Sequence, residues 1–420
     1  MEIIICILRY IIDMKYLLYL FYFFCFFPYI QLFPFNTDSQ PNALLVAAIL
    51  FCLHKGKGKM NKYLFFLLLA FMAALIILII NRPITSLGIR LVGGYISLFL
   101  IPYATYISLK ITNGIPYKLF IFVVLIWLLV GVVQLFVDLN FFQFLLYREA
   151  HSDLIESGRG VNSLAPEPTF YGVICVLLAI INQLCFRKEK YYKWILFACI
   201  TQIFVISRSS ACIFMIILSL FTYIIYQVFC SSESRNRYIL FFLGIICGTF
   251  LFFIIDFSSL ESYRIARLLS LLQSNPSMFL VIDASVNERF NHTFFSLYGF
   301  LTDWGFPHGF DAFTQKVLDI RSSGTFSTLF IDYFDPRAYQ RIMSGIGALF
   351  FELGVFAFLP LYVIVKIFYC LQPKNPGSMF CLFLYLSVML NAVPFMTALA
   401  PFIIGIVIYL NDELTSRTIL

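Results

Sequence analysis

The chain has 420 residues, of which 61% are hydrophobic, 12% are charged and 51 are Phe, and its formal net charge is +7. Soluble domains carry about 25% charged residues. The composition therefore excludes a soluble enzyme, gives no reason to expect a nucleic-acid partner, and predicts one polytopic membrane domain over residues 1–420.

Charges, prolines and glycines divide the chain into twelve apolar runs. A membrane-spanning helix needs about 20 residues, so the second run is short for a span. Twelve spans would place both ends of the chain on one side of the membrane. The runs are 16–33, 42–53, 63–80, 90–109, 118–138, 168–186, 191–206, 209–229, 238–255, 342–365, 378–391 and 395–410.

The basic residues separate by type between the two sides of this arrangement. Lysine-rich segments at 54–62 and 187–193 fall on one side, which the positive-inside rule makes cytoplasmic, together with both termini. The other side carries 12 basic residues, of which 11 are arginine. Arginine is the residue that grips phosphate or carboxylate with two parallel hydrogen bonds. The outer face is therefore predicted to bind anions, although these arginines could instead snorkel or pair with outer acids.

Two long predicted outer loops are rich in polar residues. The first covers 139–167 and the second covers 256–341. Within the second loop, residues 261–273 have apolar positions at helical spacing with Arg264 and Arg267 opposite them, which suits a helix lying on the membrane surface or an ordinary packed helix. Residues 287–313 mix glycine, aromatic and acidic residues and could line a sugar groove or form a packed cap. Eleven cysteines show no metal spacing, so neither a zinc site nor a structural disulfide is expected.

The sequence GRGVNSLAPEPTFYG at 158–172 places polar residues directly before an apolar run. Pro168 suits the first turn of a helix, so Glu167 is expected at the helix start, beside the positive end of the helix dipole. The turn Ser207-Arg208-Ser209-Ser210 is predicted to start another helix with a serine cap. Two helix N-termini, Glu167, Arg159 and Arg208 would then surround one outer pocket. The alternative is that Glu167 simply caps its helix.

These motifs resemble the O-antigen polymerase (Wzy-type) family. The resemblance rests on Arg159-Gly160, on Glu167-Pro168-Thr169-Phe170 with Gly172, and on the polar turn at Ser207-Arg208-Ser209. It extends to SGIGALFFELGVFAFLP at 344–360 and to NAVPFMTALAPFIIGIVIYL near the end of the chain. Thr169 stands where the family more usually has serine.

The resemblance implies an all-α, GT-C-like membrane glycosyltransferase with about 12 transmembrane helices. Such an enzyme polymerises undecaprenyl-diphosphate-linked oligosaccharide repeat units into O-antigen or capsule, on the periplasmic face of the bacterial cytoplasmic (inner) membrane. Its partners would be the lipid-linked donor and acceptor, membrane lipids and a chain-length regulator protein. No cofactor is expected, and the absence of an Asp-x-Asp motif agrees with arginine replacing metal at the diphosphate.

The resemblance and the position of charges in the predicted outer loops give the candidate roles. Arg159, Arg208 and Arg289 are the first candidates to bind the substrate diphosphate. The base that deprotonates the acceptor hydroxyl is expected to be Glu167, then His308, then Asp303. Glu352 is an acid within a predicted span, which suggests function, or a structural pair with an arginine. Secondary diphosphate candidates, at the base of the second loop, are Arg321, Arg337 and Arg341.

Three other functions stay open at this stage. An O-antigen ligase would share topology and donor but use lipid A–core as acceptor, and the Glu-Pro-Thr cluster favours the polymerase. A polysaccharide flippase or transporter would also have about twelve spans, but transporters concentrate charge near the membrane midplane. An assembly partner without chemistry would leave the long loop 256–341 without a role.

Overall fold

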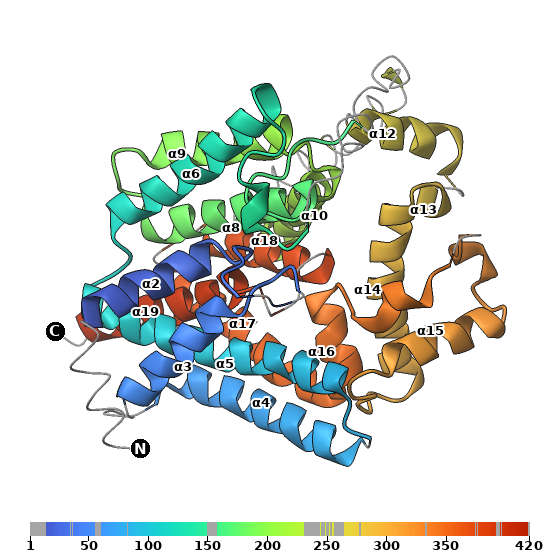
Figure 1. The fold of residues 1–420 in the computed structure, drawn as a ribbon, viewed down its shortest axis with the longest axis horizontal. Helices are drawn as coiled ribbons and strands as arrows, with labels where there is room; N and C mark the ends of the chain where they lie inside the picture. The colour runs from blue at the N-terminus through green and yellow to red at the C-terminus, as the bar shows by residue number, and fades with distance from the viewer. Residues whose placement is uncertain are drawn as a thin grey trace.

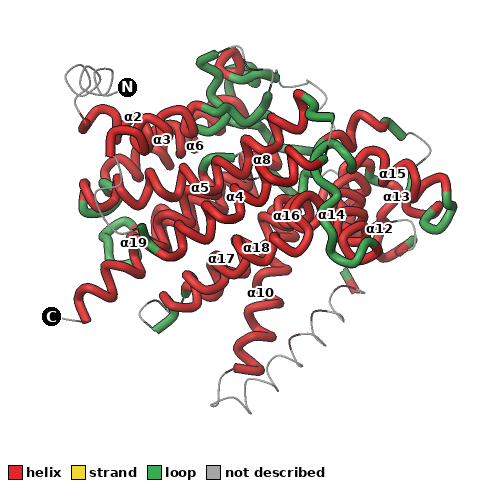
Figure 2. Tube along the Cα trace, turned by 90° about the horizontal axis from the view of Figure 1, so that it is seen from below, coloured by secondary structure: helices red, strands yellow, loops and turns green. Residues whose placement is uncertain are grey.

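The computed structural model describes residues 14–33, 35, 37–54, 60–81, 83–148, 158–230, 244, 248, 252, 254–255, 264–276, 279–331, 334–373, 375, 377–391, 395 and 397–418. Within these residues every regular element is a helix (Figures 1 and 2). The predicted all-α class is therefore correct for the described part of the chain.

The helices fall into a bundle and a smaller group beyond it. The bundle contains α2 (Met14–Phe26), α3 (Asn42–His54), α4 (Lys62–Ile80), α5 (Ser86–Thr112), α6 (Tyr117–Phe136), α8 (Pro168–Cys185), α9 (Tyr192–Thr201), α10 (Ser210–Cys230), α16 (Gly345–Leu353), α17 (Phe358–Leu371), α18 (Ser378–Asn391) and α19 (Leu399–Thr418). The smaller group, called the cap below, contains α12 (Arg264–Ser274), α13 (Phe279–Ile282), α14 (Ala284–Thr302) and α15 (Phe313–Ser322). Short connecting turns are η1 (Gln143–Leu145), η2 (Gln202–Ile206), η5 (Ser327–Leu329), η6 (Pro336–Gln340) and η7 (Gly354–Ala357).

Six helices among the described residues are long and apolar enough to cross a membrane. They are Lys62–Ile80, Ser86–Thr112, Tyr117–Phe136, Pro168–Cys185, Ser210–Phe229 and the continuous stretch Gly345–Leu371. Shorter apolar helices cover Met14–Phe26, Asn42–His54, Tyr192–Ile206 and Ser378–Asn391. The molecule is thus a helical membrane protein. The predicted ninth run, 238–255, lies almost wholly outside the described residues.

The first apolar run forms a shorter helix than predicted. Residues 16–33 were expected to be one span, but α2 ends at Phe26. Pro28 disfavours helical backbone at the residue before it and cannot donate a helical hydrogen bond. The chain therefore leaves the helix two residues before this proline, and the rest of the apolar run belongs to the connection to α3.

The cap stands at one side of the bundle in both views (Figures 1 and 2). Its own apolar core includes Phe295, Phe313, Val317 and Tyr339, and Phe351 of α16 contributes to the same core. Because Phe351 belongs to a membrane-spanning stretch, it anchors the cap to the bundle. The packing also brings α14 against α16 and α18, so side chains on α14 can reach the ends of bundle helices.

The helix predicted at 261–273 forms, but its arginines do not share one exposed face. α12 begins at Arg264, which is buried and paired with Asp283, whereas Arg267 is exposed. A buried guanidinium needs a partner for its charge, and the Asp283 carboxylate supplies it. The expectation that both arginines lie opposite the packed face is therefore wrong for Arg264.

Candidate functional site

Glu167 is the residue from which α8 begins, as the Glu-Pro sequence predicts. Its backbone is extended, with φ −148° and ψ 155°, and Pro168 occupies the first helical position. The Glu167 carbonyl accepts the first helical hydrogen bond from the N–H of Tyr171, at 3.1 Å. Its side chain, however, makes no capping hydrogen bond. The carboxylate is therefore directed to other partners, which is not what a simple capping acid does.

The turn before α10 packs directly on the segment before α8. The N–H of Val161 donates to the carbonyl of Ile206 at 3.1 Å. A Cβ at Gly160 would lie 2.0 Å from that same oxygen, so only glycine permits this approach. Ser209 Oγ accepts a hydrogen bond from the N–H of Cys212 at 3.3 Å and so caps α10. The starts of α8 and α10 consequently lie side by side.

Two guanidinium groups flank the Glu167 carboxylate. Arg289, from cap helix α14, places Nη2 3.9 Å from Glu167 Oε2. Arg148, from the connection before α8, places Nη2 3.6 Å from Glu167 Oε1. Burial lowers the pKa of Arg289 although the charge of Glu167 raises it. Arg148 and Arg289 thus share the negative charge of Glu167, so this charge does not balance Arg289 alone.

Arg159 belongs to the same electrostatic neighbourhood. Burial lowers its pKa, the positive charge of Arg264 lowers it further, and Asp283 and Glu167 oppose that change. Glu167, Arg148, Arg159 and Arg289 are called the Glu167 cluster below. Because guanidinium groups bind phosphate and carboxylate, Arg159 and Arg289 suit the Glu167 cluster to bind a further anion.

Two aspartates hold arginines at the border of the Glu167 cluster. Asp38, between α2 and α3, accepts two hydrogen bonds from Arg148, one of them from Nε at 2.7 Å. Asp283 binds Arg264 in the same two-pronged way, with Nη2 2.7 Å from Oδ1. Asp38, Arg148 and Asp283 were not among the predicted site residues, because nothing local in the sequence connects them to Glu167.

A second carboxylate, Glu288, lies beside the Glu167 cluster. Burial raises its pKa, the charge of Arg289 opposes this rise and the charge of Glu167 adds to it. Glu288 also lines a cavity of about 150 Å³ in the cap, together with Phe334 and Tyr339. Its place next to Arg289 in the sequence was the available signal for this residue, but only the arginine was predicted to belong to the site.

His308 and Asp303 form a separate cluster in the cap. Their side chains are hydrogen-bonded to each other, and Lys316 Nζ lies 2.9 Å from Asp303 Oδ2. The imidazole of His308 stacks on Phe351 with ring centroids 4.1 Å apart. Among the described residues, no hydrogen bond or ion pair connects this cluster to Glu167. The structure therefore keeps these two candidate bases apart from the first.

Two of the secondary arginine candidates interact within the cap. Arg321 lies over the ring of Phe334, 4.4 Å from its centroid. Arg337 is exposed and pairs with Asp335 through Nε at 3.1 Å from Oδ1. No hydrogen bond or ion pair of the described residues brings either guanidinium to the Glu167 cluster.

Arg208 occupies the turn between η2 and α10. Its backbone is left-handed, with φ 45°, which is uncommon for a residue other than glycine. Its Nε donates to the carbonyl of Val205 at 3.3 Å. The turn itself adjoins the Glu167 cluster through Ile206, whereas the Arg208 side chain bonds back to its own segment.

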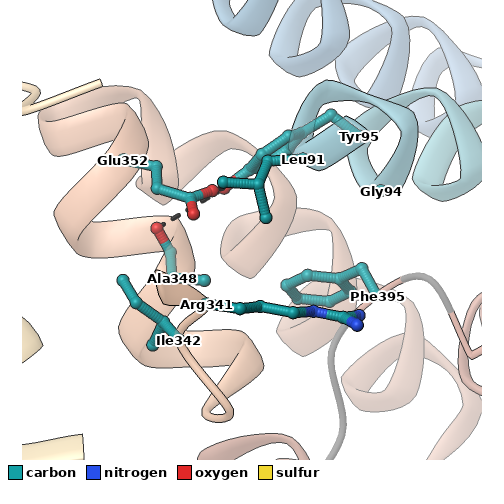
Figure 3. A pocket seen from close by; sticks show the side chains of 8 residues that line it. All are labelled: Leu91, Gly94, Tyr95, Arg341, Ile342, Ala348, Glu352 and Phe395. Carbon is teal, nitrogen blue, oxygen red and sulfur yellow. Dashed lines mark hydrogen bonds between the residues drawn. The ribbon is translucent and has the colours of Figure 1, made fainter. Parts of the chain in front are cut away.

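Arg341 and Glu352 line a small cavity of about 30 Å³ between α5 and α16. Glu352 is buried and accepts a hydrogen bond from the hydroxyl of Tyr95 at 2.6 Å. Figure 3 shows the Arg341 guanidinium extending toward Phe395 and away from the Glu352 carboxylate. The intramembrane acid is therefore partnered by a tyrosine, and the predicted arginine pair does not form among the described residues.

No family model, no curated protein and no solved structure was found to match the chain. The function is consequently inferred from the chemistry of these residues together with the resemblance of the sequence motifs.

Proposed function

We propose that the protein is a membrane glycosyltransferase that polymerises undecaprenyl-diphosphate-linked oligosaccharide repeat units into O-antigen or capsule. The observation that carries the proposal is the Glu167 cluster, in which one carboxylate and three arginines meet beside the starts of α8 and α10. Helix N-termini and arginines both favour a bound phosphate. A carboxylate next to that phosphate is placed to accept a proton.

The reaction needs two forms of assistance that the Glu167 cluster can supply. The acceptor hydroxyl oxygen attacks the anomeric carbon of the donor, and the bond between that carbon and the diphosphate oxygen breaks. Arg289 and Arg159 would neutralise the charge that develops on the departing lipid diphosphate. Glu167 would take the proton of the acceptor hydroxyl as the new glycosidic bond forms.

A position on the outer face of the bacterial cytoplasmic membrane agrees with the order of the helices. In the twelve-span topology, both termini are cytoplasmic and the starts of α8 and α10 face outward. The connection holding Asp38, the connection holding Arg148 and the cap are then all on the same side. The GT-C-like arrangement that the motif resemblance implies would have its site at the periplasmic membrane surface in this topology.

The test is a gel of surface polysaccharide from cells with the gene deleted and then restored. Wild type is compared with Glu167→Gln, Arg289→Ala and the matched control Arg267→Ala, which replaces an exposed arginine on cap helix α12. Deletion should collapse the ladder to single repeat units on their final acceptor. Wild type and the control should restore it, and the two cluster variants should fail at normal membrane levels.

Two other results would contradict the proposal. Long chains that persist on the lipid carrier and never reach lipid A–core would identify a ligase. An unchanged ladder after deletion would exclude both enzymes and favour a transporter or an assembly partner.

A further inference from the structure

A larger cavity, lined by the cation Arg90, lies at α5 beside the small cavity that Arg341 lines. The cavity measures about 210 Å³ and is enclosed by α5, the start of α3, the connection between α2 and α3, and Ala398 before α19. Arg90 lines it, and Ser97, Thr37, Ser39 and Gln40 add polar groups. The small cavity of Arg341 adjoins it at α5, because neighbouring residues of this helix line the two cavities. Arg90 and Gly93 line the larger cavity, and Leu91 and Gly94 line the smaller one.

Arg341 is a half-buried cation with no bonded counter-ion among the described residues. Its Nη2 atom is buried and has no hydrogen-bond partner in the described part of the chain. Burial lowers its pKa to about 10, and the positive charge of Arg90 contributes to that lowering. The guanidinium nevertheless stays protonated near neutral pH. A buried donor that lacks a partner destabilises the folded protein, and a charged donor does so more strongly.

Gln40, which lines the larger cavity, also has a polar atom that lacks a partner among the described residues. The Oε1 atom of Gln40 is buried and accepts no hydrogen bond from the described residues, while its amide nitrogen donates to backbone carbonyls, including that of Thr37. The remaining lining is largely apolar and includes Phe35, Leu44 and Ile101. A ligand that satisfies these groups would carry an anion for the arginines, a hydroxyl for Gln40 and an apolar part for the wall.

We infer that Arg341, Arg90 and Gln40 form a second oxyanion subsite, which holds the diphosphate and first sugar of a prenyl-linked substrate. The inference rests on the proposed function, because a polymerase must hold two lipid diphosphates at once, one on the donor and one on the acceptor. The Glu167 cluster holds the first of these, and the Arg341 subsite holds the second.

Asp38 connects the two subsites. Its carboxylate binds Arg148, which lies 3.6 Å from Glu167 Oε1. The negative charge of Asp38 also raises the pKa of Arg341, against the dominant effect of burial. The aspartate therefore acts on a cation in each subsite.

Binding stoichiometry tests the inference on the full-length protein in a non-ionic detergent. Geranyl diphosphate is titrated by calorimetry, with inorganic pyrophosphate and geraniol as separate probes. Wild type should bind two equivalents of geranyl diphosphate. Arg341→Gln should bind one, and so should Arg289→Gln, while the double variant should bind neither. Arg267→Gln, at an exposed position of α12, should keep both.

Arg90→Gln provides a second test of the subsite if Arg341→Gln fails to fold. Because Arg90 is exposed, its replacement should fold and weaken one of the two equivalents at least tenfold. Two equivalents with unchanged affinity in both Arg90→Gln and Arg341→Gln would overturn the inference. The inference would also be overturned if wild type bound only one equivalent of geranyl diphosphate and Arg289→Gln bound none. This second result would leave the proposed function intact.

The separate probes identify the source of the anion. In Arg289→Gln, geranyl diphosphate should bind at least tenfold more tightly than pyrophosphate, and geraniol should not bind. Equal affinity for geranyl diphosphate and pyrophosphate would overturn the prenyl assignment and identify a site for a free diphosphate. Failure of the proposed function is a different result, namely an unchanged polysaccharide ladder after gene deletion.

Discussion

Arg289 Nη2 lies 3.9 Å from Glu167 Oε2, although the first residue belongs to the cap and the second to the start of a bundle helix. This contact ties the position of the cap to the acid that we propose as the base. Anything that moves α14 would therefore change the charge beside Glu167.

Replacement of Arg289 should affect catalysis more than stability. Arg289→Ala removes a half-buried cation from the proposed diphosphate subsite, and loss of one such charge-stabilising donor costs about 10²–10³ in rate. Arg289→Lys keeps the charge but loses the planar fork, so it should recover only part of the rate. Chain elongation measured with equal amounts of membrane protein checks this. An Arg289→Ala enzyme as active as Arg267→Ala would contradict it.

Asp283→Asn should destabilise the cap. The substitution keeps an oxygen that can cap α14 but removes the charge that balances buried Arg264. Breaking a buried ion pair costs about 3–5 kcal/mol, so the unfolding midpoint should fall clearly in thermal denaturation. Asp335→Asn, at the pair with exposed Arg337, is the control and should change the midpoint little. Equal midpoints for the two variants would refute the role of the Asp283 pair.

The same aspartate predicts a pH dependence of stability. Burial raises the pKa of Asp283, but hydrogen bonding to Arg264 and its positive charge lower it below the ordinary value of 3.8 overall. A lowered folded-state pKa gives stability that is complete above the ordinary pKa and is lost as pH falls through the folded value. The difference between wild type and Asp283→Asn should therefore shrink below about pH 4. A difference that is constant down to pH 2 would contradict this origin.

Glu288→Gln should raise stability at neutral pH, whereas Asp283→Asn should lower it. Burial raises the pKa of Glu288, so the folded state favours the protonated acid. The ionised form then lowers stability as pH rises from about 4.5 through the raised folded value. Glu288→Gln should be more stable than wild type at pH 7 and equal to it near pH 4. Thermal denaturation across this range checks the sign, and a variant less stable at pH 7 would refute it.

Gly160→Ala should separate the segment before α8 from the turn before α10. The new Cβ would lie 2.0 Å from the carbonyl oxygen of Ile206, which is a backbone atom that cannot rotate away. The backbone at 160 must shift, and Arg159 shifts with it. We expect at least a tenfold loss of polymer in the ladder assay, with protein still present in the membrane. A wild-type ladder would show that this close approach is unnecessary.

Local signals in the sequence predicted the starts of the two central helices. Pro168 fixed where α8 begins, and the serines at 209 and 210 indicated the cap of α10, because these preferences act within one helical turn. Long apolar runs predicted the spanning helices for a similar reason. The early end of α2 was missed because the apolar residues after Pro28 look like a continued span.

Tertiary packing decided what the sequence left open. Arg148 reaches Glu167 from one connection and Asp38 reaches Arg148 from another, and Arg264 turns inward to Asp283. The pairing of these charges therefore depends on the fold. His308 and Asp303 were grouped with Glu167 because all three lie in loops predicted on the outer face. The cap folds them onto Phe351 and Lys316 instead.

Chain elongation by the purified protein tests the central claim most directly. Wild type, Glu167→Gln, Arg289→Ala and Arg267→Ala are each reconstituted with the lipid-linked repeat unit, and products are separated by size. We predict that wild type and Arg267→Ala make chains of several units with release of lipid diphosphate, while the two cluster variants are at least a hundredfold slower. If wild type makes no chain, or if both cluster variants elongate at the wild-type rate, the Glu167 cluster is not the active site of a polymerase.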